Sequence, residues 1–334
     1  MLALDRAAWG RNREAAGFLV SLAFVALASV RDVYLGGLFQ RWSPLHVAIV
    51  AFTLCSVVFL PIAWARDPKG LRILLRRPGE LFWVNVTSAI AWISFFQALK
   101  AIEPALVQVL FSGVGPLTVR WLDRLVPGAA PPATLHPAEG PCHLGLLASL
   151  VATASITLAG VSGAGALPLG VAAFGVALAA GAGVSISVNT VLCKKLNQAG
   201  VNPAALVALR FPGAIVVAAV LSGPPGDLAA LPSIGALAPV AGAALLLIVF
   251  PVYVSQVGVS LASPLTVRVA FSLAPVFIFA LQLFEGRLAS SPYSLAAAGV
   301  YCVFAVGGAV ARQRATRGVA FHLNPGRARP QSAT

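Results

Sequence analysis

Long apolar segments separated by short polar connections run through the whole chain. Each segment has roughly 18 to 25 residues, enough for an α-helix to cross the ~30 Å hydrocarbon core of a bilayer. The pattern predicts an all-α integral membrane protein with ten transmembrane helices. The expected spans are Gly17–Leu38, Pro44–Ala65, Leu81–Lys100, Pro104–Val126, Leu144–Val161, Leu169–Leu192, Pro203–Leu221, Ile234–Tyr253, Pro264–Phe284 and Tyr293–Ala311.

The composition excludes a soluble fold. Hydrophobic residues make up 59% of the chain and charged residues 10%, whereas ordinary globular domains carry ~25% charged residues. The mean hydropathy is +0.89. The four cysteines have no paired spacing, so neither a disulfide framework nor a zinc site is expected.

The basic residues gather in alternate connections. If the N-terminus is cytoplasmic, seventeen basic residues fall on the cytoplasmic side, and only Arg41, Lys100 and Arg287 fall on the other side. The positive-inside rule then predicts that both termini are cytoplasmic, which requires an even number of spans. The basic start followed by an apolar stretch and Ala26-Leu27-Ala28 also fits a cleavable signal peptide, which is the alternative for the first span.

One segment of the first half recurs in the second half. Pro104–Ser112 matches Pro264–Ser272 at the proline, two valines, the phenylalanine and the serine, 160 residues later. Other pairs near this period are Ser29 with Ser187, Pro44 with Pro203 and Phe52 with Phe211. We therefore expect two five-helix repeats, 17–162 and 169–311, between an N-terminal segment 1–16 and a disordered basic tail 312–334. Five helices is an odd number, so the second repeat is inverted. Shared composition of alanine- and valine-rich helices is the alternative.

Several segments resemble the drug/metabolite transporter superfamily, in its EamA-like ten-helix branch. They are Phe96–Ala105 leading into Pro116-Leu117, Ala262–Pro264 leading into Ala274–Val276, and Phe284–Leu288 followed by Gly299-Val300. The likeness extends over 17–311. It implies a carrier of small metabolites, amino acids or drugs, an exporter in the cytoplasmic (inner) membrane, with a cavity between the repeats.

Four candidate ionisable residues lie at membrane depth within the expected spans: Arg31, Asp32, Arg210 and Arg268. Such groups cost at least ~2.5 kcal/mol at membrane depth, so they face a cavity or a partner. Arg31 and Asp32 diverge by ~100° on a helix and are poorly placed to pair with each other. Arg268 lines the cavity or snorkels to the cytoplasmic surface. For Arg31 and Asp32 the alternative to substrate binding is a structural pair with another helix or snorkelling to the outer interface. The resemblance places the helix of Arg210 outside the cavity.

Other candidates for substrate binding are aromatic, amide and hydroxyl side chains on the same helices. An aromatic wall with amides suits an amphipathic ligand, and arginines at the cavity suit an anionic group. The candidate residues are Arg31, Asp32, Trp92, Phe96, Gln97, Gln108, Ser112, Asn189, Tyr253, Gln256, Arg268 and Ser272.

The sequence carries no enzyme signature. Phosphate-binding and zinc-protease motifs are absent from it, so no cofactor is expected. The expected function is secondary transport of a small metabolite, such as an amino acid or another small organic anion or amphiphile, with proton or ion coupling through Asp32 as one option. The expected partners are the substrate and the lipid bilayer, with no nucleic acid, and the protein is a monomer or a homodimer. An integral-membrane enzyme and a channel-like protein remain the alternatives.

Overall fold

The computed structural model describes the backbone of residues 2–125, 137–223, 234–262 and 264–322, and the side chains of residues 15–118, 137–223, 238–262, 266–267 and 269–311.

Proline marks the start of most helices. Proline suits the first turn because its missing N–H would have no helical partner there. The helices in chain order are α1 (Leu2–Leu38), α2 (Pro44–Arg66), α3 (Pro68–Leu75), α4 (Pro78–Ala101), α5 (Pro104–Leu125), α6 (Glu139–Leu158), α7 (Leu169–Gln198), α8 (Pro203–Leu209), α9 (Pro212–Leu221), α11 (Ile234–Ala244), the π-helical segment η1 (Leu245–Val249), α12 (Phe250–Leu261), α13 (Pro264–Phe271), α14 (Ala274–Glu285) and α15 (Pro292–His322).

Within the described residues the chain contains helices and no strands, and eight helical stretches are long and apolar enough to cross a membrane. These spans are Ala15–Leu38, Pro44–Arg66, Pro78–Ala101, Glu139–Leu158, Leu169–Gln198, Pro203–Leu221, Ala238–Leu261 and Pro292–Ala311. Two shorter apolar stretches are Pro104–Thr118 and Val269–Glu285. The expectation of an all-helical multi-pass membrane protein is thereby confirmed.

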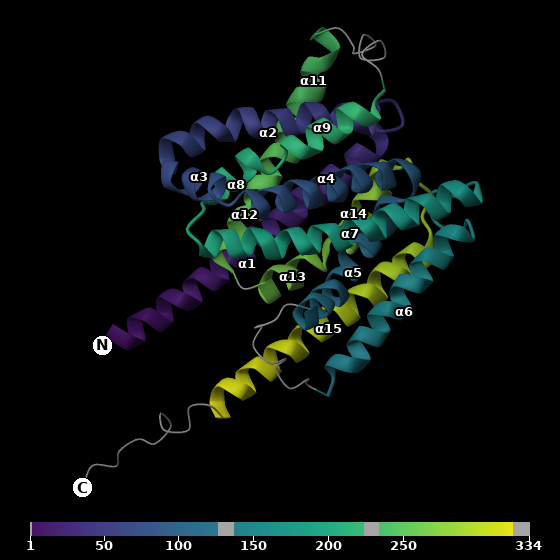
Figure 1. Ribbon diagram of the computed structural model, residues 1–334. Coiled ribbons are helices and arrows are strands. Elements are labelled where there is room, and N and C mark those ends of the chain that lie inside the picture. Colours follow the sequence, from purple (N-terminus) through teal and green to yellow (C-terminus); the bar gives the residue numbers. More distant parts are fainter. Residues whose placement is uncertain (1, 126–136, 224–233, 263, 323–334) are drawn as a thin grey trace.

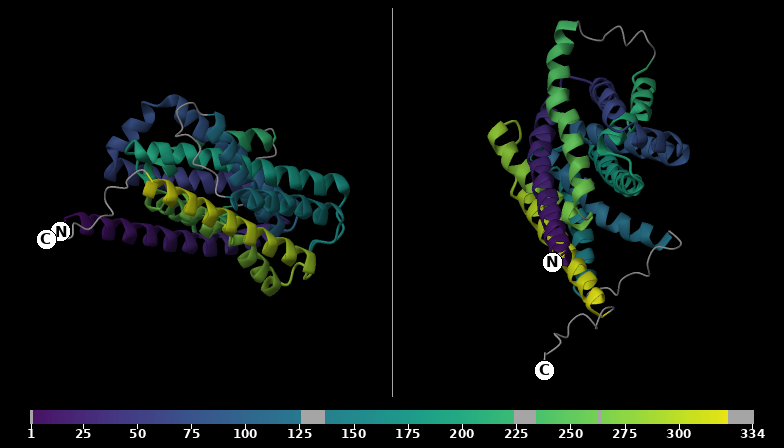
Figure 2. Two further views of the ribbon diagram at one scale, coloured as in Figure 1. Left: turned by 90° about the horizontal axis from the view of Figure 1, so that it is seen from below. Right: turned by 90° about the vertical axis from the view of Figure 1, so that its left-hand side faces the viewer.

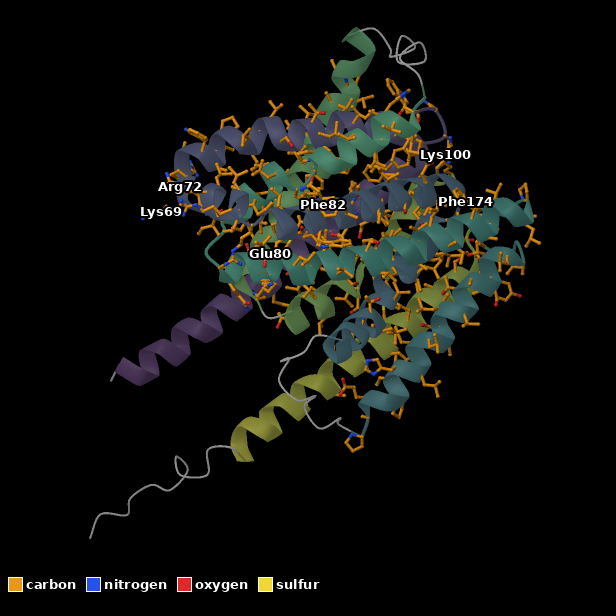
Figure 3. The ribbon with its side chains drawn as sticks, viewed as in Figure 1. Lys69, Arg72, Glu80, Phe82, Lys100 and Phe174 are labelled. Atoms are coloured by element: carbon orange, nitrogen blue, oxygen red, sulfur yellow. The ribbon has the colours of Figure 1, made fainter. Side chains whose placement is uncertain are left out.

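The outer surface of the bundle is apolar. Large hydrophobic side chains are exposed along most spans, including Trp64, Val220 and Phe284, the last of which is 88% exposed. An apolar surface of this extent is unfavourable in water and fits contact with lipid chains. The charged side chains lie mainly at the two ends of the bundle, as Figure 3 shows for Lys69 and Arg72 at one end and Lys100 at the other.

Helices distant in sequence pack side by side. The closest pairs are α4 with α7, α5 with α7, α6 with α15 and α1 with α12, while α2 packs on α8 and α9. Figure 1 places α2 and α9 on one flank and α6 with α15 on the opposite flank. The start of α1 and the end of α15 lie at the same end of the bundle, which we call the terminal end (Figure 2). The other end, where α4 meets α5 and α14 meets α15, is called the far end.

Two spans bend where proline follows. The stretch Pro203–Leu221 is interrupted between α8 and α9, directly before Pro212, and the stretch that begins at Pro264 is interrupted between α13 and α14, shortly before Pro275. Proline cannot donate to the preceding turn and its ring clashes with the carbonyl four residues earlier, so the helix breaks. Arg210 lies at the first break and Ser272 at the second.

The first and the last helix extend beyond the expected spans. Helix α1 begins at Leu2, within the segment set apart as 1–16. Helix α15 continues to His322, so the start of the segment expected to be a disordered tail, 312–322, is helical instead. Residues 323–334 lie outside the described part of the chain.

A buried hydrogen-bond cluster joins four elements at the far end. Glu103 is only 1% exposed, and its carboxylate accepts hydrogen bonds from Gly163 N at 2.7 Å, Ser294 Oγ at 2.7 Å and Gln282 Nε2 at 2.9 Å. Gln282 Oε1 in turn accepts from Ala105 N at 2.8 Å. The Glu103 cluster therefore ties the α4–α5 and α6–α7 connections to α14 and α15.

Candidate functional site

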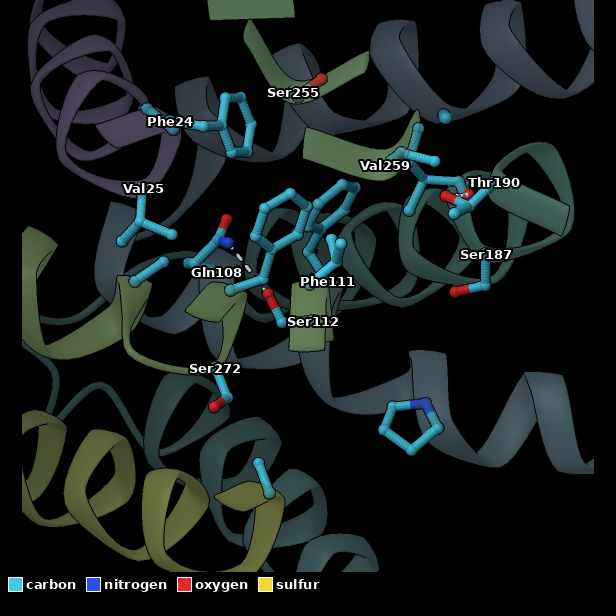
Figure 4. Close-up of a pocket in the computed structure, with 18 of the residues that line it drawn as sticks. Phe24, Val25, Gln108, Phe111, Ser112, Ser187, Thr190, Ser255, Val259 and Ser272 are labelled. Carbon is cyan, nitrogen blue, oxygen red and sulfur yellow. Dashed lines mark hydrogen bonds between the residues drawn. The ribbon is translucent and has the colours of Figure 1, made fainter. Parts of the chain in front are cut away.

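A cavity of about 620 Å³ lies among helices that are distant in sequence. It is lined by residues of α1, α4, α5, α6, α7, α12, α13, α14 and α15 (Figure 4). Arg31 and Trp92 line it about two turns inside the far ends of α1 and α4, whereas Lys194 and Gln198 line it at the terminal end of α7. The cavity thus runs from the terminal end into the interior of the bundle.

Arg31 and Asp32 form an ion pair inside the protein. Arg31 Nε lies 2.7 Å from Asp32 Oδ1, and the two side chains are 4% and 1% exposed. The expectation that these neighbours are poorly placed to pair was wrong. Their Cβ atoms diverge, but the long arginine stem folds back, and burial makes pairing favourable because an unpaired charge in an apolar interior is costly.

The Arg31 guanidinium also faces aromatic rings. Its Cζ lies 5.1 Å from the Trp92 ring centroid and 5.6 Å from the Phe95 ring centroid, distances at which a cation is attracted to the face of a ring. Among the described residues, Arg31 Nη1 and Trp92 Nε1 are buried without a hydrogen-bond partner. Both residues line the cavity, so this part of the site offers two hydrogen-bond donors.

Two amide side chains supply acceptors on the cavity wall. Gln108 Nε2 donates to Ser112 Oγ at 2.9 Å, as the dashed line in Figure 4 marks. Gln108 Oε1 and Gln256 Oε1 are buried and accept no hydrogen bond within the described part of the chain. These residues come from α5 and α12, and both line the cavity. Buried acceptors without partners are uncommon, and they indicate a place where a ligand or water completes the bonding.

Arg210 lines the cavity, contrary to the placement that the resemblance implied. It is 3% exposed, and its Nε donates to Ser88 Oγ at 3.0 Å. No carboxylate among the described side chains lies within ion-pair distance of it. The break between α8 and α9 is what turns this residue inward, and that break was not part of the sequence prediction.

Of the predicted site residues, six line the cavity: Arg31, Trp92, Gln108, Ser112, Gln256 and Ser272. Ser272 Oγ donates to Val269 O at 2.8 Å within its own bend. Arg268 lies on α13, but its side chain is outside the described part of the chain. The remaining five, Asp32, Phe96, Gln97, Asn189 and Tyr253, lie outside the cavity wall.

Three of those five residues pack between helices instead. Tyr253 stacks on Phe59 at 4.9 Å between ring centroids, and Phe96 is fully buried in the aromatic core. Asn189 Nδ2 lies 3.0 Å from Val84 O, 2.8 Å from Thr87 Oγ1 and 2.9 Å from Ser88 Oγ. Asn189 therefore joins α7 to α4, next to the serine that receives Arg210.

Most of the apolar wall was not anticipated. Six aromatic residues outside the predicted set line the cavity: Phe24, Phe95, Phe111, Phe271, Tyr301 and Phe304. Phe111 and Phe271 occupy matching places in the duplicated segment, so the repeat itself was a signal that both face the same space. The inward faces of α6 and α15 had no such signal because both helices also carry large apolar residues on their exposed sides.

Comparisons with known proteins identify the fold alone. No family model matches the chain, and no curated protein matches it. A solved crystal structure of a protein is similar, with a TM-score of 0.61 and 19% sequence identity, over 91% of this chain and 98% of that one. At this identity the likeness supports the arrangement of helices and carries no function.

Proposed function

We propose that this protein is a secondary transporter that carries a small organic solute across the membrane by alternating access through the cavity. In this proposal ten helices form two inverted five-helix repeats, with Pro104–Thr118 and Val269–Glu285 extended by their flanking residues to complete the fourth and ninth spans. Inverted repeats can pack in two nearly equivalent arrangements, and each arrangement opens a central site to one side.

Contacts between matching residues support the repeat. Phe52 and Phe211 occupy equivalent positions, 159 residues apart, and their rings stack at 4.6 Å between centroids with planes 8° apart. Two equivalent residues touch each other only when they lie near the axis that relates the halves. Ser29 and Ser187, a second matched pair, each donate to the carbonyl four residues earlier at 2.7 Å.

The helix pairs follow the same relationship. The third helix of the first half, α4, packs on the first helix of the second half, α7, and α12 packs on α1 in the same way. The second helices, α2 and α8–α9, pack on each other, as do the fifth helices, α6 and α15. An exchange of the two halves thus leaves the pairing pattern unchanged.

One-sided access to the cavity is the observation on which the proposal rests. Residues that line the cavity extend to Lys194 and Gln198 at the terminal end, and none of those described lies in the far-end connections. The Glu103 cluster holds the far end together. A carrier must be closed on one side while it is open on the other, whereas a channel needs a continuous path.

The remaining features of the proposal follow from the sequence. The distribution of basic residues supports cytoplasmic termini, so the cavity faces the cytoplasm in this conformation. Loading from that side supports export from the cytoplasm across the cytoplasmic (inner) membrane. The segments similar to the drug/metabolite transporter superfamily support membership in its EamA-like branch. Asp32, with one buried oxygen lacking a partner among the described residues, is the candidate for proton coupling.

Solute counterflow tests the proposal. Purified protein is reconstituted in proteoliposomes loaded with one of a set of unlabelled amino acids, organic acids or amines, and uptake of the same labelled compound is followed. A carrier gives a transient overshoot of label, because exchange is faster than net movement. Label that merely equilibrates at a rate independent of the internal solute would indicate a channel. No protein-dependent uptake of any compound in the set would reject the transport function.

A further inference from the structure

The polar atoms of the cavity point to the chemistry of the solute, an inference that rests on the proposed transport function. We infer that the site takes a small amphipathic organic acid with one negative charge, such as a carboxylate, a separate N–H or O–H donor and an apolar body.

The anionic group would meet the two free donors. Arg31 Nη1 and Trp92 Nε1 are buried, belong to residues that line the cavity and have no partner in the described part of the structure. Arg31 Cζ lies over the Trp92 ring at 5.1 Å, so the two side chains that carry these donors are in contact. Asp32 Oδ1 accepts a hydrogen bond from Arg31 Nε and so holds the guanidinium in place. Oxygen atoms of a carboxylate accept from such donors in short, strong hydrogen bonds.

A second guanidinium lies along the same face of α4. Arg31 contacts Trp92, and Arg210 donates to Ser88. Residues four apart lie one above the other on a helix, so Ser88 and Trp92 are separated by about one turn, roughly 6 Å along the axis. The two guanidiniums therefore approach the cavity from α1 and from the α8–α9 break at adjacent levels.

The described lining residues carry more positive than negative charge. The cations are Arg31, Lys194, Lys195 and Arg210, and Glu139 is the one acid among the described lining residues. Asp32 pairs with Arg31, and Glu80 pairs with both Arg77 and Lys195. An anionic solute suits this wall, whereas a cation would add to positive charge that is already costly at the depth of Arg31 and Arg210.

The two glutamine side chains on the cavity wall require a hydrogen-bond donor on the solute. Gln108 Oε1 and Gln256 Oε1 are buried acceptors without donors among the described residues, and an acidic oxygen would repel them. An N–H or O–H group on the solute satisfies them. The rest of the wall is aromatic, with Phe24, Phe111 and Phe271 among the lining residues, so the body of the solute is apolar. A cavity of about 620 Å³ suits a compound of this kind.

Matched probes separate the three requirements. N-acetylphenylalanine has the negative charge, the donor and the apolar body, and phenylpropionate lacks the donor. N-acetylphenylalaninamide lacks the charge, and phenylethylamine carries a positive charge instead of a negative one. Binding is measured from the shift in melting temperature of the full-length protein in phosphatidylcholine nanodiscs, whose headgroups carry no net charge. We expect affinity to fall in that order, with about tenfold or more lost on removal of the charge.

Substitutions in the cavity wall test which residues cause the differences in affinity between the probes. Because Arg31→Gln alone leaves Asp32 buried without its partner, the double variant Arg31→Gln/Asp32→Asn removes the anion site while keeping the pair neutral. It should bind N-acetylphenylalanine about tenfold more weakly or worse. Trp92→Phe should reduce affinity for both acids, and Gln108→Leu should weaken N-acetylphenylalanine while sparing phenylpropionate. Arg287→Gln, an arginine change at the exposed far end, is the matched control and should bind normally.

The outcomes are separable from those of the transport assay. The inference is overturned if the amide or the amine binds as well as the acids, if neither acid binds, if the double variant binds like the parent, or if added phosphatidylglycerol displaces the probe and so identifies a lipid headgroup as the ligand. Binding of acids without counterflow would reject the carrier and keep the anion site. Counterflow of a neutral or cationic solute without acid binding would reject the anion site and keep the carrier.

Discussion

Phe96 stacks on Phe52 at 6.0 Å between ring centroids with planes 7° apart, and Phe52 also stacks on Phe211 at 4.6 Å. The three rings form an aromatic column that joins α4, α2 and the start of α9, and all three side chains are fully buried. Trp92, at the cavity wall, meets Phe52 edge-on at 5.9 Å. The column therefore connects the packing of the core to the position of a binding-site residue.

Truncation of the column should destabilise the fold. Phe52→Ala and Phe211→Ala are each expected to lower the free energy of unfolding by about 3 to 5 kcal/mol because each leaves a cavity. The double-mutant cycle should give a coupling of about 0.5 to 1.5 kcal/mol for the stacked pair. Reversible unfolding in mixed micelles measures both. Phe174→Ala, at a residue 61% exposed on α7, is the control. Full additivity of Phe52→Ala and Phe211→Ala would contradict a contact between them.

Close approach of α5 and α7 should depend on Gly183. A Cβ at this position would collide with the backbone oxygen of Phe111 and the side chain of Val114, whereas a Cβ at Gly181, two residues away, would meet open space. Gly183→Ala should therefore lower stability by about 1 to 3 kcal/mol through overpacking. Gly181→Ala should be neutral or slightly stabilising because alanine favours helix. Melting temperatures of the two variants in the same detergent measure the difference. Equal melting temperatures would show that the helices can separate without cost.

The Glu103 cluster should control which end of the protein is closed. Glu103→Gln keeps the size of the side chain but places an amide N–H₂ among three donors, at a cost of about 1 to 3 kcal/mol. We expect a larger fraction of molecules open at the far end, measured as faster maleimide labelling of a cysteine introduced at Ser162, which is buried there. Glu285→Gln, an exposed change at the same end, should leave the labelling rate unchanged. An unchanged rate in Glu103→Gln would remove the cluster from the gating step.

The native cysteines report on the cavity directly. Cys142 lines the cavity and is partly exposed, while Cys55 and Cys193 are fully buried. An impermeant maleimide should therefore label Cys142 well before Cys55 or Cys193, as peptide mass spectrometry would record. If the termini are cytoplasmic, labelling occurs in inside-out vesicles and is slow in right-side-out vesicles. The reverse pattern would overturn the proposed orientation, and Cys142→Ser provides the background.

The sequence predicted the location of the eight spans that the described residues form, with ends that differ by up to eight residues, and predicted their internal geometry poorly. Its boundaries for Pro44–Ala65 and Leu81–Lys100 lie within three residues of α2 and α4. Prolines punctuate these ends, and proline acts on the local backbone whatever surrounds it. By contrast, the ion pair of Arg31 with Asp32 depends on how far a flexible side chain folds back, which spacing along a helix does not fix.

Hydropathy summed over a segment decides whether it enters a bilayer, so the sequence by itself determined that this chain is a multi-pass helical membrane protein and which ionisable groups lie inside it. Only the tertiary structure decided that Arg210 faces the cavity while Phe96 and Tyr253 face the core. In lipid, the outer and the packed sides of a helix are both apolar, so no periodicity marks the inner face. The rotation of each helix is set by contacts with helices far away in the sequence.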